Sequence, residues 1–190
     1  MGTSDRIVEA AQGILVAEGS AAVTMRRVAD VVGVTAMAIY KHFANREALL
    51  EAVAQRTFGE LAATWGARVP EGDWDDRAFG LMGDFLDFAL GTPHLYAFLM
   101  TERREQARQF PEGFQGGGSP AFSPVVELIA EGMRLGLLRQ DDPLEVTLVI
   151  TSSTQGLVQL YLGGRIALSE TEFRALCTRT IRRILHGIQA

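Results

Sequence analysis

Three consecutive side chains near the start of the chain, Tyr40, Lys41 and His42, carry a phenol, an ammonium group and an imidazole. Groups of these types can hydrogen-bond to the phosphate oxygens and base edges of duplex DNA. Ile39 and Phe43 are four residues apart, a spacing that puts both on the inner face of a helix and the polar groups outside. These residue types, in this order, predict a helix whose exposed surface contacts DNA.

The flanking residues predict the elements that would position this surface. Thr24 is the expected N-cap of a first helix, because its hydroxyl can accept from free backbone N–H groups two or three residues later. Gly33 has the backbone freedom needed to end that helix, and Thr35 is the expected N-cap of the next one. The pattern is that of a helix-turn-helix, whose second helix docks in the major groove.

Two groups of side chains are expected to contact the DNA. The second helix offers Thr35, Ala36, Met37, Tyr40 and Lys41. The flanks offer His42, Arg46, Thr24, Arg26 and Arg27. Two alternatives stay open at this point. The pair of helices could be an ordinary hairpin with a solvated face, and one of the two adjacent arginines could pair with Asp30 or Glu47 rather than with DNA.

This stretch resembles the DNA-binding domain of the TetR family of bacterial one-component transcriptional regulators. Residues 5 to 51 carry nearly all of the resemblance, at Gly19, Thr24, Val28-Ala29, Gly33-Val34-Thr35, Ile39-Tyr40, His42-Phe43, Arg46-Glu47 and Leu49-Leu50. Through this resemblance, Thr24, Tyr40, His42 and Arg46 are expected to meet mainly phosphates. The remainder of the chain resembles the family only in its length and helical character.

The expected organisation is a DNA-binding domain over residues 1–50 and a helical effector-binding and dimerisation domain over residues 51–190. The function implied is that of a dimeric repressor, released from its operator DNA by a small apolar effector. Activation instead of repression remains open, because no residue pattern reports on polymerase contact. The alternative from another class is a helical ligand- or partner-binding protein whose N-terminal domain contacts protein.

Composition is that of a globular chain, with 190 residues, 47% hydrophobic and 22% charged. No apolar run approaches the roughly 20 residues of a membrane span. The first residues lack the basic and apolar blocks of a signal peptide, so a cytoplasmic location is expected. Cys177 is the only cysteine, which excludes an intrachain disulfide and agrees with a reducing compartment.

The net charge of −5 at first argues against a DNA partner. The distribution of charge weakens that objection, because the stretch from Thr24 to Arg46 has four basic residues and Asp30 as its only acid. A small basic face on an acidic body would orient the protein on phosphates, and binding should then weaken steeply with salt.

The whole chain is predicted to be helical, with about nine helices. Besides the motif, helices are expected over residues 5–18, 45–65, 74–90, 93–100, 120–138, 143–162 and 169–187. The clearest break is expected at residues 69–72. The polar and then glycine-rich stretch 102–119 is expected to be a loop, mobile in its second half.

Large apolar side chains in the middle of the chain could line an effector cavity, which the family resemblance implies. The candidates are Phe58, Trp65, Phe85, Phe88, Phe98, Met100, Phe122 and Met133, with Gln155 as a polar contact. The alternative is that the apolar side chains are plain core and that Gln155 faces a subunit interface.

The last two helices are the expected dimer interface, because each carries an apolar stripe. The expected contacts are Leu148, Gln155, Ile181, Ile184 and Leu185. Two helices from each subunit can form a four-helix bundle, which would set the recognition helices about one DNA turn apart, roughly 34–36 Å, or further. Alternatively, these helices only close the core of their own subunit.

Catalytic residues, a metal site and a cofactor are not expected. His42, His94 and His186 are scattered, with no second histidine three or four residues away. The glycine run 116–118 is not followed by the lysine and hydroxyl residue of a phosphate-binding loop.

Overall fold

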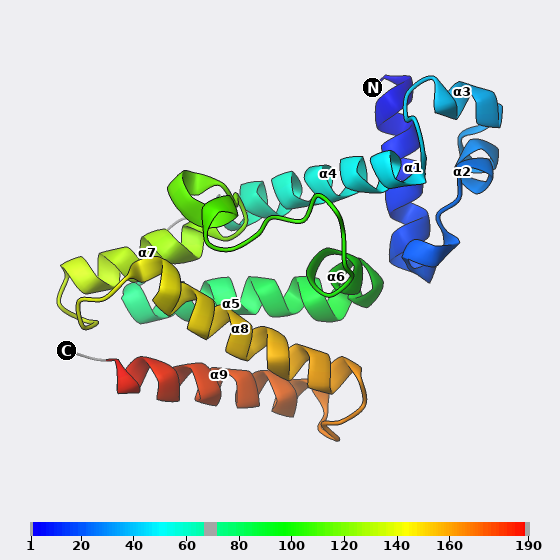
Figure 1. Cartoon of the computed structure of the whole chain (residues 1–190). Helices are drawn as coiled ribbons and strands as arrows, with labels where there is room; N and C mark the ends of the chain where they lie inside the picture. Colours follow the sequence, from blue (N-terminus) through cyan, green and yellow to red (C-terminus); the bar gives the residue numbers. More distant parts are fainter. Residues whose placement is uncertain (1, 67–71, 189–190) are drawn as a thin grey trace. The chain divides into compact units, whose positions relative to one another are not determined.

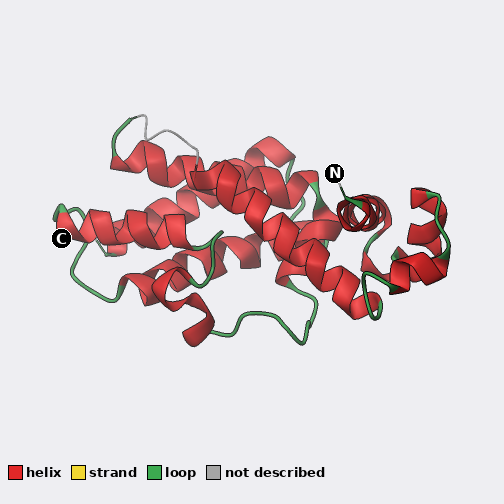
Figure 2. Ribbon diagram, turned by 90° about the horizontal axis from the view of Figure 1, so that it is seen from above, coloured by secondary structure: helices red, strands yellow, loops and turns green. Residues whose placement is uncertain are grey.

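The computed structural model describes residues 2–66 and 72–188. Figure 2 shows helices and loops throughout these residues, so the predicted all-helical fold class is confirmed. The elements, labelled in Figure 1, are α1 Thr3–Glu18, η1 Ser20–Ala22, α2 Met25–Val32, α3 Ala36–Tyr40, α4 Arg46–Gly66, α5 Trp74–Gly91, α6 Pro93–Met100, η2 Glu112–Gly117, α7 Ser123–Arg134, α8 Pro143–Leu162 and α9 Glu170–Gly187. Here η denotes a short 3-10 helix.

The chain forms two compact units, and each unit is made of two separate stretches of the sequence. The first unit joins residues 1–61 to residues 92–107. The second unit joins residues 62–91 to residues 108–190. Helix α4 therefore begins in one unit and ends in the other. The predicted functional boundary at residue 50 stays a prediction.

The core of the first unit is built on α1. Ile7, Ala11 and Leu15 are fully buried on it, at the four-residue spacing that puts them on one face of the helix. Helix α1 packs against α2 and α6, and α2 packs against α3. The other buried apolar side chains of this unit come from α2, α3, the first half of α4 and α6, and include Val28, Ala29, Ile39, Leu49, Val53, Ala54, Leu95, Tyr96 and Phe98.

The core of the second unit lies among α5, α7, α8 and α9. Its buried cluster consists of Trp74, Leu128, Ile129, Met133, Leu138, Val146, Ile150, Ile181 and Leu185. The Trp74 indole N–H donates to the carbonyl oxygen of Leu128 at 2.8 Å. This bond satisfies the one polar group that the ring brings into the core.

Helix α7 is shorter than the helix predicted over residues 120–138, so that prediction is wrong at both ends. It ends at Arg134 because the next residues fold back on its last turn. The backbone N–H groups of Leu137 and Leu138 both donate to the carbonyl oxygen of Gly132, at 2.9 and 3.2 Å. Gly136 permits this reversal, with a φ of 72° in the left-handed region.

The stretch 102–119 is more regular than predicted, because it contains η2. Around η2 the Phe114 ring lies 6.1 Å from that of Phe110 and 5.1 Å from that of Phe122, between ring centroids. The predicted break at residues 69–72 lies outside the described residues except for Gly72. Within the described part of the chain, no helix is both long and apolar enough to cross a bilayer.

Candidate nucleic-acid interface

The two predicted caps of the helix-turn-helix are confirmed. The Thr24 hydroxyl accepts from the backbone N–H of Arg27 at 3.2 Å, and the Thr35 hydroxyl accepts from that of Ala38 at 3.2 Å. Each hydroxyl therefore satisfies a donor that the first turn of its helix would otherwise leave free.

Gly33 forms the turn between the two helices. Its φ is 75° and its ψ is 38°, the left-handed conformation that glycine adopts without a Cβ penalty. Its N–H donates to the carbonyl oxygen of Ala29 at 2.9 Å, which closes the end of α2. The sharp turn then directs α3 so that its inner face meets α2.

Helix α3 separates buried and exposed side chains sharply. Ile39 is fully buried, whereas Met37 is 70% exposed and Tyr40 is 50% exposed. Thr35 is also exposed, and Ala36 is half-buried. The outer surface thus offers a thioether, a phenol and a hydroxyl to solvent, on an element whose position the inner face fixes.

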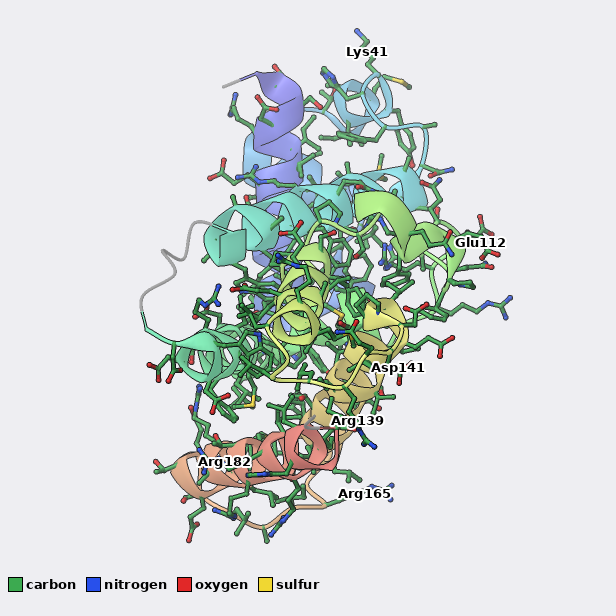
Figure 3. The ribbon with its side chains drawn as sticks, turned by 90° about the vertical axis from the view of Figure 1, so that its left-hand side faces the viewer. Lys41, Glu112, Arg139, Asp141, Arg165 and Arg182 are labelled. Carbon is green, nitrogen blue, oxygen red and sulfur yellow. The ribbon has the colours of Figure 1, made fainter. Side chains whose placement is uncertain are left out.

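The helix predicted to carry Ile39 to Phe43 is shorter than expected, because α3 ends at Tyr40 and Lys41 and His42 lie in the turn after it. The backbone N–H groups of His42 and Phe43 donate to the carbonyl oxygen of Ile39, at 2.9 and 3.0 Å, so this turn stays tight. Both Lys41 and His42 are exposed, and Figure 3 shows Lys41 extended away from the ribbon.

Three arginines flank this surface in different states. Arg26 is exposed, and within the described residues neither Arg26 nor Lys41 pairs with a carboxylate. Arg27 donates to both carboxylate oxygens of Glu18, one of them at 2.9 Å. This hydrogen bonding raises the pKa of Arg27 and lowers the pKa of Glu18. The partner of Arg27 is therefore a residue of α1, and neither of the two acids that the sequence suggested.

The Arg46 side chain hydrogen-bonds to backbone carbonyl oxygens within the first unit. Its Nε donates to the carbonyl oxygen of Val23 at 2.8 Å, and its Nη2 donates to that of Ser20 at 2.5 Å. Beside it, the Asn45 side chain accepts from the backbone N–H of Ala48 at 2.7 Å, in the first turn of α4. The phosphate contact expected of Arg46 stays a prediction.

Two family models match the chain. Residues 7–53 match the model of bacterial regulatory proteins of the tetR family. Residues 78–184, more than half of the chain, match the model of the tetracyclin repressor-like C-terminal domain.

The chain belongs to the TetR family.

Solved structures agree in fold with this TetR-family chain. A protein of unknown function from Rhodococcus sp. RHA1 has a TM-score of 0.81 at 23% identity, covering 100% of this chain and 97% of that one. The regulator FadR from Bacillus subtilis, in complex with stearoyl-CoA, has a TM-score of 0.75 at 15% identity, covering 97% and 99%. A TetR-family regulator from Haemophilus influenzae has a TM-score of 0.70 at 18% identity, covering 98% and 96%. No curated protein matches the chain.

As a member of this family, the chain is a DNA-binding transcriptional regulator. Within the described residues, no three His, Cys, Asp or Glu side chains are grouped so that they could hold a metal ion.

The side chains predicted to bind an effector are divided between the two units. Phe58, Phe98 and Met100 belong to the first unit, and Trp65, Phe85, Phe88, Phe122, Met133 and Gln155 belong to the second. The Trp65 ring makes edge contacts with the rings of Phe85 and Phe88, at 6.4 and 6.5 Å between centroids. Met133 belongs to the buried core cluster, in agreement with the plain-core alternative.

A hollow of about 270 Å³ opens in the second unit at a place that the sequence did not indicate. It is lined by Arg139, Gln140, Asp141, Val146 and Ile188, none of which was predicted to bind an effector. The backbone N–H of Arg139 donates to the carbonyl oxygen of Ile188 at 2.8 Å, which joins the middle of the α7–α8 loop to the residue after α9. No periodic pattern could have indicated this position, because it depends on where two distant segments meet.

The side chains predicted at the dimer interface also differ in exposure. Ile181 and Leu185 lie in the core cluster, and Ile184 packs against it, as in the alternative in which the last helices close their own subunit. Leu148 is exposed and Gln155 is half-buried on α8. Three further apolar side chains on α8, Val149, Leu160 and Leu162, are 54%, 44% and 40% exposed, and the prediction did not include them.

Proposed function

We propose that this TetR-family regulator is a dimeric repressor that reads its operator with the exposed face of α3 and the turn after it. The observation that carries the proposal is the exposure of Met37 and Tyr40 next to Lys41, on a helix held in place by the fully buried Ile39. In this reading, Lys41 meets a phosphate or a guanine, and Tyr40 meets a phosphate or a thymine methyl group.

The rest of the proposed surface divides into base contacts and backbone contacts. Thr35, Ala36 and Met37 would reach the groove, while Thr24, Arg26 and His42 would meet the flanking phosphates. Arg27 and Arg46 would take part only by sharing or leaving their present partners. Because the phosphate contacts are electrostatic, the logarithm of the binding constant should fall linearly with the logarithm of the salt concentration. The slope should be about −0.9 for each phosphate neutralised.

The proposed effector is a small molecule that is largely apolar. Support comes from the Bacillus subtilis FadR, which shares the fold and is in complex with stearoyl-CoA, a molecule with a long hydrocarbon chain. The effector would release the DNA by binding better to a conformation in which the two α3 surfaces no longer match adjacent grooves.

The proposed interface is tested with a labelled duplex that spans the DNA upstream of the chain's own gene. We expect Lys41→Ala and Tyr40→Ala each to weaken binding at least tenfold in fluorescence anisotropy. Lys41→Ala should also lower the salt slope by about 0.9, because one phosphate contact is lost. Leu135→Ala, an exposed apolar site in the second unit, is the control and should bind as the wild type does.

Circular dichroism must show unchanged helix content in each variant. Wild-type affinity in both α3-surface variants would overturn the assigned face. Binding of the wild type with no salt dependence would favour the alternative, in which the N-terminal domain contacts protein.

A further inference from the structure

Glu51 of α4 and Arg104, which follows α6, form a largely buried ion pair in the first unit. Arg104 Nη1 lies 3.2 Å from Glu51 Oε2, and the two side chains are only 13% and 14% exposed. The guanidinium carbon lies 5.8 Å from the ring centroid of Phe58 and 5.4 Å from that of Phe98. A cation is thus held between two aromatic rings and one carboxylate, with little water around it.

The hydrogen bonds of this pair are incomplete. Arg104 Nη2 donates to the carbonyl oxygen of Leu99 at 3.4 Å, but Nε is buried and has no acceptor among the described residues. The second oxygen of Glu51 accepts from the Gln55 side chain at 2.6 Å. A buried pair with an unsatisfied donor loses much of its Coulombic gain to desolvation, and apolar replacements of such pairs are often as stable or more stable. Stability alone therefore does not account for this pair.

The position of Arg104 in the chain suggests another role. Residues 92–107 pack with the first unit, whereas the stretches on either side of them, residues 62–91 and 108–190, belong to the second. The segment is also tied to the end of α1 and to η1. His94 Nδ1 lies 3.3 Å from the carbonyl oxygen of Val16, and the Ser20 hydroxyl donates to Glu102 at 2.7 Å. The backbone enters the first unit at Thr92 and leaves it after Ala107. A displacement that travels along the backbone at these two crossings therefore reaches this segment first.

We propose that Glu51 and Arg104 are a latch that fixes the register of residues 92–107 against α4, and that the latched register is the one that binds operator DNA. A geometrically demanding ion pair suits this role, because apolar contacts of α6 such as those of Leu95 and Leu99 tolerate sliding, whereas a planar guanidinium between two rings and a carboxylate does not. Arg104 is then a positioning residue for regulation. The link to the operator rests on the proposed function above.

The test compares three variants with the wild type. Arg104→Met alone leaves the Glu51 carboxylate buried and unpaired, and should lower the unfolding temperature. Glu51→Leu with Arg104→Met removes both charges, and should restore the wild-type unfolding temperature or exceed it. In the double variant, we expect the amides of residues 92–107 to exchange with deuterium at least tenfold faster, and operator affinity to fall at least tenfold. If the pair served only stability, a double variant with the wild-type unfolding temperature would also show wild-type exchange and wild-type operator affinity.

The control is the Arg77–Glu131 pair of the second unit, in which Nη2 lies 2.6 Å from the carboxylate. Arg77→Met with Glu131→Leu should leave the exchange of residues 92–107 and operator affinity unchanged. Wild-type exchange in the Glu51–Arg104 double variant would overturn the latch. Faster exchange with wild-type operator affinity would overturn its regulatory role.

Arg104→Lys provides a second route if the double variant does not fold. It keeps the charge but lacks the planar fork, so the segment should still exchange faster than in the wild type, and wild-type exchange would contradict the proposal. The exchange measurement needs no DNA. It therefore judges the latch even if the wild type fails to bind the duplex, an outcome that would count against the proposed function alone.

Discussion

Arg27 shows how a single contact can limit a DNA-binding surface, because Glu18 already occupies its guanidinium. We expect Glu18→Gln to strengthen operator binding, since it removes a negative charge from the flank and frees Arg27 for a phosphate. The salt slope should steepen by about 0.9, the value for one added phosphate contact. The measurement is a salt titration of operator binding by fluorescence anisotropy.

Glu9→Gln is the matched control, because Glu9 is an exposed acid on the same helix and the net charge changes equally. An equal gain in both variants would mean that general charge, and not the release of Arg27, is responsible. The hydrogen bond from Arg27 keeps the pKa of Glu18 below its ordinary value. The carboxylate therefore stays ionised at neutral pH, so the substitution, and not a moderate change of pH, is needed to remove it.

At this scale the residue types could be predicted from the sequence, but their partners could not. Thr24 and Thr35 cap helices as expected, because a cap depends only on residues two or three positions away. Glu18 meets Arg27 only because α1 and α2 come together in the fold, and Arg46 meets the carbonyl oxygens of Ser20 and Val23 only because α4 lies against η1 and the residue after it. Such pairings leave no local pattern.

At the scale of elements, the contact between α5 and α7 depends on a missing Cβ. A Cβ at Gly132 would lie 2.9 Å from the Trp74 ring, whose N–H donates to Leu128. We expect Gly132→Ala to lower the free energy of unfolding by about 1–3 kcal/mol, the range for overpacking. This loss outweighs the gain in helix propensity, about 1 kcal/mol. Urea denaturation measures the difference.

Gly83→Ala on α5 is the control, because a Cβ there meets nothing within 4 Å. It should raise the free energy of unfolding by up to about 1 kcal/mol through helix propensity alone. A stable Gly132→Ala variant would show that the Trp74 ring can move aside without losing its hydrogen bond.

Element boundaries were predictable where a capping residue marks them. Helix α9 begins after Ser169, close to its predicted start, and the hydroxyl and N–H of Ser169 exchange hydrogen bonds with Glu172 in a capping box. Helix α7 ends early for a reason that a periodic pattern does not carry, the return of Leu137 and Leu138 to the carbonyl oxygen of Gly132. Thr92 precedes α6, but its hydroxyl makes no capping hydrogen bond there.

At the scale of the whole molecule, the division into units was outside the reach of sequence patterns. The motif is local, so a boundary near residue 50 could be predicted from it, and that boundary stays a prediction. The joining of residues 92–107 to residues 1–61 depends on burial of side chains such as Leu95 and Tyr96 against a partner far away in the chain. Periodicity shows that α6 has apolar side chains to bury, but it does not name the partner.

The last prediction concerns the interface of the proposed dimer. The outward face of α8 carries Val149 and Leu160 with the smaller Ser152 and Gly156 between them, all exposed. These four residues fall on one side of the helix, so a two-fold axis near the middle of α8 would bring Val149 of one copy towards Leu160 of the other. We therefore place the interface on this face, and no longer on Ile181 and Leu185, which the subunit core already uses.

Val149→Arg should convert the dimer to a monomer in size-exclusion chromatography with light scattering, because each copy would bury an unpaired cation against Leu160 of the other copy. Operator affinity should fall at least tenfold, since a monomer engages one half-site and loses the advantage of linked binding. Leu135→Arg carries the same change at another exposed apolar site of the second unit and should remain dimeric. A dimeric Val149→Arg variant would exclude this face of α8, and a monomeric Leu135→Arg variant would move the interface to the end of α7.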